Sequence, residues 1–203
     1  TNLTDGGNIS GALSDQLTLT NIAIGDAGNY NVVISDGSAG CGNVNSQNAT
    51  LTINLTSVGG TVNSDNTVCY GTNTGTLTLS GKTGNVTDWE YSTDGGTTWT
   101  TVSPTNATTS LTYTNLTQTT QYRAVVVSGV CSADRSSAAT ITVNALPTIT
   151  AASTATDVCF SSTAQTTTLN YSATTNAPTT YSITWSGTLA TVTDAALKPG
   201  TIT

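Results

Sequence analysis

Apolar and polar residues alternate along much of the chain, and this period of two predicts strands rather than helices. The clearest runs are GTLTLSG (75–81), DWEYS (88–92), SLTYTNL (110–116), QYRAVVV (121–127) and ATITVN (139–144). Turn-forming residues separate these runs at short intervals, and no segment carries the stripe of an amphipathic helix. The pattern therefore predicts an all-β protein built from small sandwiches.

A long internal repeat sets the size of those sandwiches. Cys41 and Cys131 lie 90 positions apart (131 − 41), and so do Cys69 and Cys159 (159 − 69). The segments CGNVNSQNATLTIN and CSADRSSAATITVN, which begin at Cys41 and Cys131, have equal length and share six identities. A fixed period of this length indicates a tandem array of domains. We expect the C-terminal part of one domain in residues 1–54, a complete repeat in residues 55–144, and the N-terminal part of a further repeat in residues 145–203.

Two segments resemble the tyrosine corner of immunoglobulin-like domains, in which a phenol bonds back to the upstream backbone. The first is D-x-G-x-Y at Asp26, Gly28 and Tyr30, ahead of an alternating strand. The second precedes the strand that contains Tyr122, with Leu116 upstream. The sequence thus predicts immunoglobulin-like β-sandwiches arranged in an elongated array.

A family resemblance follows from the run VCYGTNTGTLTLSG…WEYSTDGGTTW…LTYTNLTQTTQYRAVVVSGVCS…SSAATITVN. It resembles the immunoglobulin-like repeats of giant cell-surface proteins of Bacteroidetes, above all those of flavobacterial gliding-motility adhesins. The resemblance covers residues 55–144 well and residues 145–203 less well. It implies a secreted protein, exported by the type IX route and located at the cell surface, in association with the outer membrane. It implies no catalytic residues.

The composition argues against two classes of function, nucleic-acid binding and catalysis. Only 7% of the residues are charged, the net charge is −7, and there is no His. Four basic residues cannot neutralise a phosphate backbone, so nucleic acid is not an expected partner. General acid–base catalysis needs a positioned base, and nothing in the sequence places two carboxylates together. We expect no enzyme, no cofactor and no segment that crosses a membrane.

The motif S-T-D-G-G-T-T-W at residues 92–99 fits the Asp-box of sialidase hairpins. Asp94 and Gly96 are typical of a tight turn, with Trp99 packed beneath it. A sialidase would also need an arginine cluster, and the chain contains only Arg123 and Arg135. We interpret the motif as a structural turn.

Two hypotheses are open for the aromatic residues: they pack in the sandwich core, or they form a face on which sugars stack. Trp89 and Trp185 lie in alternating strands and are expected in the core, whereas Trp99 is expected to be partly exposed. The acidic residues are scattered, so the segment NSDNT (63–67) is expected to form a turn rather than a calcium site.

The cysteines are expected to form disulfides rather than a zinc site, because zinc ligands are closely spaced. We predict a Cys69–Cys131 disulfide, since both residues belong to the one complete domain. In the rival arrangement, Cys41–Cys69 and Cys131–Cys159 would connect neighbouring domains. It is disfavoured because the strand that Cys41 begins leads away from it towards the junction.

These observations predict a non-catalytic repeat segment of a secreted surface adhesin, acting as a spacer or adhesive stalk. Its partners would be neighbouring repeats of the same chain, together with surface polysaccharide or other cells. The alternative is a carbohydrate-binding accessory module of a larger secreted enzyme. A third hypothesis is self-association through sheet edges that lack the Lys that usually guards an edge.

Overall fold

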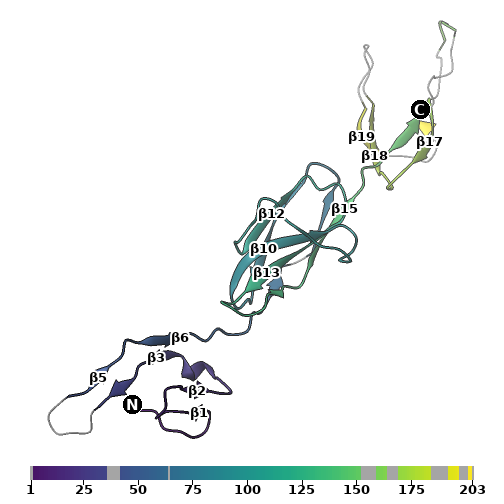
Figure 1. Ribbon diagram of the computed structural model, residues 1–203. Coiled ribbons are helices and arrows are strands. Elements are labelled where there is room, and N and C mark those ends of the chain that lie inside the picture. The colour runs from purple at the N-terminus through teal and green to yellow at the C-terminus, as the bar shows by residue number, and fades with distance from the viewer. Residues whose placement is uncertain are drawn as a thin grey trace.

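The structure is a computed structural model, and it describes residues 2–35, 42–63, 65–151, 159–163, 169–183, 192–196 and 201–202. Three groups of strands follow one another along a line, with the N-terminus near one end and the C-terminus near the other (Figure 1). The described residues form strands and one short 3₁₀ helix, and they include no α-helix. The chain is therefore all-β, as the alternating pattern predicts, and elongated, as the 90-residue repeat predicts.

The middle group is a two-layer sandwich. One layer has the order β11-β10-β13-β15-β8, with the short β14 also paired to β13, and the other has the order β12-β9-β7. The first layer comprises β8 (Asn66–Cys69), β10 (Asn85–Ser92), β11 (Thr100–Thr101), β13 (Thr120–Val127), β14 (Asp134–Arg135) and β15 (Ala139–Asn144). The second comprises β7 (Thr61–Val62), β9 (Thr74–Ser80) and β12 (Ser110–Thr114).

This topology is immunoglobulin-like. The chain changes layer at the β7–β8, β8–β9, β9–β10, β11–β12 and β12–β13 connections, so that both sheets are built from strands distant in the sequence, as in an immunoglobulin-like sandwich. All strand pairs of the sandwich are antiparallel except β8 and β15, which run parallel with Asn66 opposite Ile141 and Cys69 opposite Asn144. The parallel pair places an early strand beside the last one. The unit can thereby receive the chain at one end and release it at the other.

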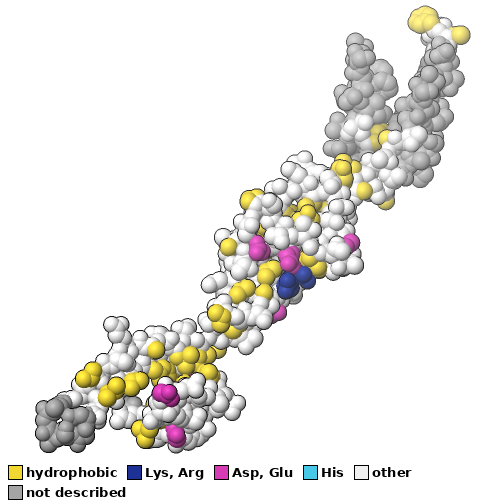
Figure 2. All heavy atoms as spheres, viewed as in Figure 1, with side chains coloured by type: hydrophobic (Ala, Val, Ile, Leu, Met, Phe, Trp, Pro, Cys, Tyr) yellow, Lys and Arg dark blue, Asp and Glu magenta, His cyan; other side chains and the backbone are white. Residues whose placement is uncertain are grey.

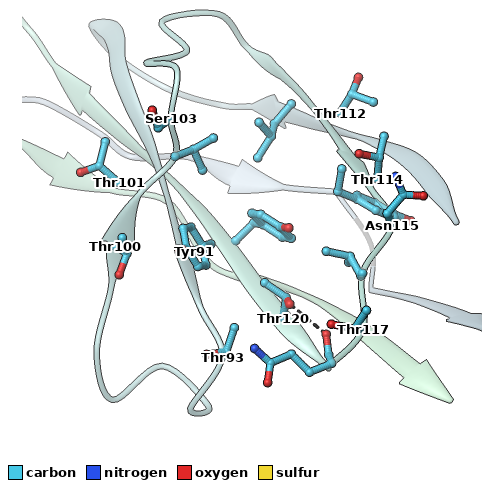
Figure 3. A pocket seen from close by; sticks show the side chains of 16 residues that line it. Tyr91, Thr93, Thr100, Thr101, Ser103, Thr112, Thr114, Asn115, Thr117 and Thr120 are labelled. Carbon is cyan, nitrogen blue, oxygen red and sulfur yellow. Dashed lines mark hydrogen bonds between the residues drawn. The ribbon is translucent and has the colours of Figure 1, made fainter. Parts of the chain in front are cut away.

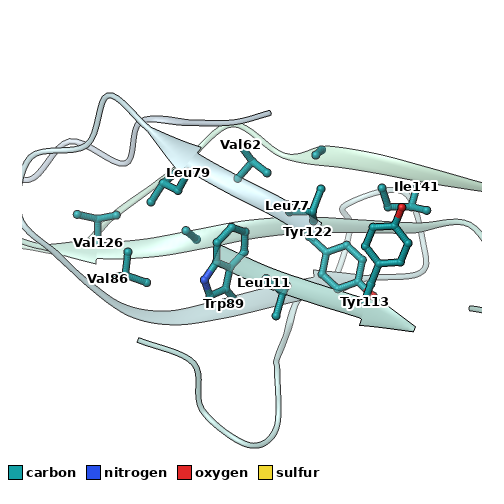
Figure 4. Close-up of a cluster of buried hydrophobic side chains, with 12 residues drawn as sticks. Val62, Leu77, Leu79, Val86, Trp89, Leu111, Tyr113, Tyr122, Val126 and Ile141 are labelled. Carbon is teal, nitrogen blue, oxygen red and sulfur yellow. The ribbon is translucent and has the colours of Figure 1, made fainter. Parts of the chain in front are cut away.

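The core lies between the two layers. Its fully buried large side chains are Leu77, Trp89, Val126 and Ile141. Figure 4 shows side chains of β9 and β12 facing those of β10 and β13 across it. The Trp89 indole also donates a hydrogen bond of 2.9 Å from Nε1 to the Thr108 carbonyl. The alternating residues of the sequence thus supply the core, because a period of two points every second side chain inward.

The flanking groups are less extensive. The N-terminal strands form pairs, β1 with β2, β3 with β6 and β4 with β5. Their bounds are β1 (Ile9–Ser10), β2 (Thr18–Leu19), β3 (Gly28–Tyr30), β4 (Val33–Ile34), β5 (Val44–Asn45) and β6 (Ala49–Leu51), with the 3₁₀ helix η1 at Ile24–Asp26. None of the described residues in 2–35 and 42–54 is buried. The assignment of residues 1–54 to part of a larger domain stays a prediction.

The C-terminal strands are β16 (Ile149–Ala151), β17 (Leu169–Thr174), β18 (Thr180–Ile183), β19 (Val192–Ala196) and β20 (Thr201–Ile202). β17 pairs with β16 and β20, and β18 pairs with β19. Trp185 and Cys41 lie outside the described residues, so the core role expected of Trp185 also stays a prediction.

The predicted Cys69–Cys131 disulfide is wrong, because both side chains are free thiols. Cys69 ends β8 opposite Asn144, at the pole where the chain leaves the sandwich. Cys131 lies in the turn after β13, where its N–H bonds the Ser128 carbonyl. β13 runs between the two poles and has eight residues, which is a distance on the order of 30 Å, whereas a disulfide needs Cα atoms within about 7 Å. The prediction failed because two cysteines of the same domain can lie at opposite poles of it.

Candidate functional site

A hollow of the sandwich lies along its open side, between the edge strands β11 and β12. It has a volume of about 540 Å³. Ten of its sixteen lining residues are polar, and seven of these ten are Thr. Figure 3 shows Thr100 and Thr101 on one side, Thr112 and Thr114 on the other, and Tyr91 between them. The site exists because β11 is only two residues long and leaves the space beside it unfilled.

Three tyrosines form the floor of this hollow. The Tyr122 ring stacks on Tyr113 with centroids 6.3 Å apart and lies 6.5 Å from Tyr91. Burial raises the pKa of Tyr122 to about 12, with smaller contributions from Tyr91 and Tyr113. Tyr122 therefore keeps its proton at neutral pH and acts as a packing group. Tyr91 is only partly buried, so its ring is the aromatic surface available to a ligand here.

The Asp-box segment forms a turn held together by its own side chains. Asp94 Oδ1 accepts hydrogen bonds from the N–H groups of Thr97 and Thr98, both at 2.9 Å, and Oδ2 accepts one from Thr98 Oγ1 at 2.5 Å. The Ser92 hydroxyl donates to Asp94 at 2.7 Å. These bonds hold the pKa of Asp94 well below its usual range, chiefly through Thr98. The carboxylate is thus committed to the turn and is not available for catalysis.

Glycine is required in this turn. Gly96 has a φ of +89°, and a Cβ at that position would lie 2.9 Å from Oε1 of Gln121. The Gly96 carbonyl accepts a bond of 2.9 Å from the indole of Trp99. The turn and its tryptophan therefore form one unit, as the structural interpretation of the motif predicts.

Trp99 connects the turn to a small charged cluster on β10 and β13. The Arg123 guanidinium lies over the Trp99 ring, 3.9 Å from its centroid, and Arg123 Nε bonds Glu90 Oε2 at 2.7 Å. Arg135 approaches the same carboxylate oxygen at 3.7 Å. In the space-filling view, basic atoms lie against acidic ones on the middle sandwich, on a surface that is mostly neither (Figure 2). Arg123 is therefore paired with Glu90 inside the cluster, and Arg135 lies more loosely beside the same carboxylate.

The two predicted tyrosine corners have different outcomes. The Tyr30 phenol donates a hydrogen bond of 2.5 Å to the Asp26 carbonyl, four residues upstream, which is the expected geometry. Tyr122 lies near the start of the corresponding strand β13, but its contacts are the stacked rings described above. In the middle sandwich the connection is instead fastened by Asn73, whose side chain bonds both the N–H and the carbonyl of Leu116.

The described residues assemble no metal centre. No group of three or more His, Cys, Asp or Glu side chains lies close enough to hold an ion among them. In the segment 63–67, Asn63 accepts a bond from the Thr78 N–H at 2.6 Å, and Asp65 accepts one from the Thr140 N–H at 2.7 Å. These oxygens bond to β9 and β15, and the turn expected at residues 63–67 stays a prediction. No helix of the described part of the chain is long and apolar enough to cross a membrane.

Sequence reasoning missed the features that depend on strand pairing. The Glu90–Arg123 pair joins residues that lie directly opposite each other on β10 and β13. The hollow depends on which strands form the edges, and the Asn73 contacts join residues 43 positions apart. Opposite charges at alternating positions of two predicted strands were the one available signal for the ion pair.

Residues 58–145 match the model of a family described as a domain of unknown function (DUF8696). No curated protein sequence matches the chain. Among solved structures, it is similar to immunoglobulin domains 1–5 of Sidekick-1, with 16% identity, a TM-score of 0.32, and coverage of 73% of this chain and 33% of that one. A structure of Sidekick-1 domains 1–4 gives 16% identity, a TM-score of 0.30, and coverage of 73% and 42%. The chain thus spans less than half the length of these structures, and the family match lies on the middle sandwich.

Proposed function

We propose that the chain is a non-catalytic segment of a cell-surface stalk, in which sandwiches joined end to end hold a distal part away from the cell. The observation that carries this proposal is the position of the two ends of the middle sandwich. Residues 54–57 contact the turn after β13 at one pole, and Asn144 ends β15 at the other. A unit that receives and releases the chain at opposite poles adds its full length to an array.

Contacts at the entry pole support a restricted junction. The Ser57 hydroxyl is buried and accepts a bond of 2.9 Å from the Ser128 N–H. Asp134 Oδ2 accepts a bond of 2.8 Å from the Gly59 N–H, which lowers the pKa of that carboxyl. A Cβ on Gly129 would lie 2.1 Å from the Asn54 side chain, so linker and turn are in close contact. The two hydrogen bonds fix the first residues of the middle unit to that unit, and the contact of Gly129 with Asn54 leaves little room for the preceding residue to move.

The surface chemistry agrees with an extracellular stalk. The side chains that line the hollow are largely hydroxyls, and the paired Glu90 and Arg123 leave little free charge on β10 and β13. We place the protein outside the cell, in a secreted adhesin of the kind found in gliding Bacteroidetes, with neighbouring repeats as its constant partners. Accessibility to added protease on intact cells tests the location.

Small-angle scattering of the full chain tests the stalk. A compact globule of 203 residues has a radius of gyration of about 17 Å. An end-to-end array must exceed this value clearly, and a flexible Gly-Ser insertion after Asn144 should broaden the distance distribution, because it releases the junction. A radius of gyration near the globular value would overturn the proposal.

A second candidate, carbohydrate binding, is favoured by the hollow alone. Tyr91 offers a partly exposed ring surrounded by hydroxyls, an arrangement suited to stacking and hydrogen bonding of a neutral sugar. A glycan array with Tyr91→Ala tests it. Tyr70→Ala is the matched control, since Tyr70 is 46% exposed and lies beside the exit pole. Specific binding lost only in Tyr91→Ala would favour this candidate over a plain spacer.

A further inference from the structure

The entry pole of the middle sandwich presents a thiol to the residue that precedes the unit. Cys131 Sγ lies 3.7 Å from the carbonyl oxygen of Asn54 and 3.3 Å from that of Leu55. The Cys131 side chain is partly buried, and its turn is closed by the bond from its own N–H to the Ser128 carbonyl. The sulfur is therefore held against the junction, close to Asn54.

The exit pole presents a second thiol to the residue that ends the unit. Cys69 is exposed and lies opposite Asn144 in the parallel ladder of β8 and β15. The Tyr70 N–H bonds the Asn144 carbonyl at 2.8 Å, and the Asn73 side chain bonds the Cys69 carbonyl at 2.7 Å. Neighbouring strands are about 4.8 Å apart, so the Cys69 backbone is fixed at that distance from Asn144.

In a tandem repeat, the residue that ends one unit is also the residue that precedes the next unit. Asn54 and Asn144 end the two equivalent sequence segments that begin at Cys41 and Cys131, and they lie 90 residues apart (144 − 54), which is the period of the cysteines. In two successive copies of the unit, the Cys131 thiol of the second copy approaches the last residue of the first copy. The backbone of Cys69 in the first copy is already paired with that same residue. We propose that the two thiols form a disulfide across the junction, from Cys69 of one unit to the cysteine at position 131 of the unit that follows.

The geometry excludes a bond within one unit and permits this one between units. Within a unit the two poles are on the order of 30 Å apart, far beyond the reach of a disulfide. Across the junction, the Cys131 sulfur lies 3.7 Å from the carbonyl oxygen of the asparagine that precedes the unit, and the Cys69 backbone lies one strand spacing from the asparagine that ends it. The bond fastens the junction covalently and leaves the sandwich core, which contains no cysteine, unchanged.

The reaction is two thiol–disulfide exchanges with a low-molecular-weight disulfide such as oxidised glutathione. In the first, the Cys69 thiolate attacks the oxidant, forms a mixed disulfide and releases one glutathione thiolate. In the second, the thiolate of the following unit attacks the protein sulfur of the mixed disulfide and releases the other glutathione. The two cysteines lose two electrons and two protons, and one oxidised glutathione becomes two reduced molecules.

A duplicated chain provides the test. A second copy of residues 55–144 is inserted after Asn144 of the full chain, and all cysteines except two are changed to Ser. The junction variant keeps Cys69 of the first copy and Cys131 of the second. A matched variant keeps Cys131 of the first copy and Cys69 of the second, and a third keeps both cysteines of the first copy. Each variant is incubated with oxidised glutathione, alkylated, and mapped by mass spectrometry, and far-UV circular dichroism verifies that all three are folded.

We expect the junction variant to form the intramolecular disulfide at least about tenfold faster than the other two, because the effective concentration of its thiols reaches the millimolar range. Loss of this advantage in 4 M urea would show that the folded junction is responsible. Equal rates in all three folded variants, or a faster reaction in either control, would overturn the proposal. It relies on the end-to-end order of the proposed stalk. However, the scattering experiment needs no cysteine, so an extended chain whose junction thiols do not react would refute the disulfide alone.

Discussion

Truncation of Trp89 is the sharpest test of how the middle sandwich is stabilised. The side chain has 0% exposure and lies between the two layers, with its indole N–H bonded to Thr108. Trp89→Ala removes the largest buried side chain and also leaves the Thr108 carbonyl without that donor. Truncations of this kind cost about 3–5 kcal/mol of the free energy of unfolding.

This loss is a large fraction of the free energy of unfolding of a unit of this size. At about 0.05–0.15 kcal/mol per residue, a sandwich of about 90 residues is stable by about 5–13 kcal/mol. With an m value of about 1.5 kcal/mol/M in urea, the unfolding midpoint of the full chain should fall by about 2–3 M. Far-UV circular dichroism is the suitable probe, because it does not depend on the tryptophan that is removed.

Trp99→Ala is the matched control. Trp99 is partly exposed and loses one stacked Arg123 and one bond to the Gly96 carbonyl, worth about 1–2 kcal/mol together. Trp89→Phe keeps most of the buried ring and so separates packing from the hydrogen bond. The reasoning is refuted if Trp89→Ala lowers the midpoint no more than Trp99→Ala does.

Three further predictions concern polar groups. Asp94 has a folded-state pKa below that of the unfolded chain. The stability that its ionised carboxylate supplies is therefore present above about pH 4 and is lost as the pH falls further. Urea midpoints measured from pH 2 to 6 should vary less in Asp94→Asn than in the parent. Tyr122 has its pKa raised from 10.0 to about 12, so the stability that its protonated phenol supplies is present below pH 10 and is lost as the pH rises through 12. Tyr122→Phe should therefore move alkaline unfolding, followed by circular dichroism, to higher pH. An unchanged midpoint would contradict this. Tyr30→Phe removes the bond to the Asp26 carbonyl and should destabilise the N-terminal strands by about 0.5–1.5 kcal/mol, measured as faster amide hydrogen exchange at β3 and β6 with no change in the middle sandwich.

The alternating pattern was sufficient to predict the strands and most of the core, because side-chain direction in a strand depends only on the period of two. Trp89 was expected in the core and is fully buried, and so are Leu77 and Ile141, which lie in two of the predicted strands. The turn at Asp94 was also predictable, since its bonds join residues at most four positions apart.

Features that depend on contacts between distant residues required the tertiary structure. The Glu90–Arg123 pair, the Asn73 contacts with Leu116 and the hollow beside β11 all depend on which strands become neighbours. Spacing along the chain does not specify this order.

The cysteines show the division most clearly. The sequence by itself determined that they recur with the domains, because a period of 90 residues can be read without any structure. Only the fold decided where they lie, since the parallel pairing of β8 with β15 places Cys69 at the exit pole, and the turn after β13 places Cys131 at the entry pole. A sequence gives the separation of two residues along the chain, whereas a disulfide depends on their separation in space. The direction in which each strand runs decides how the first separation becomes the second.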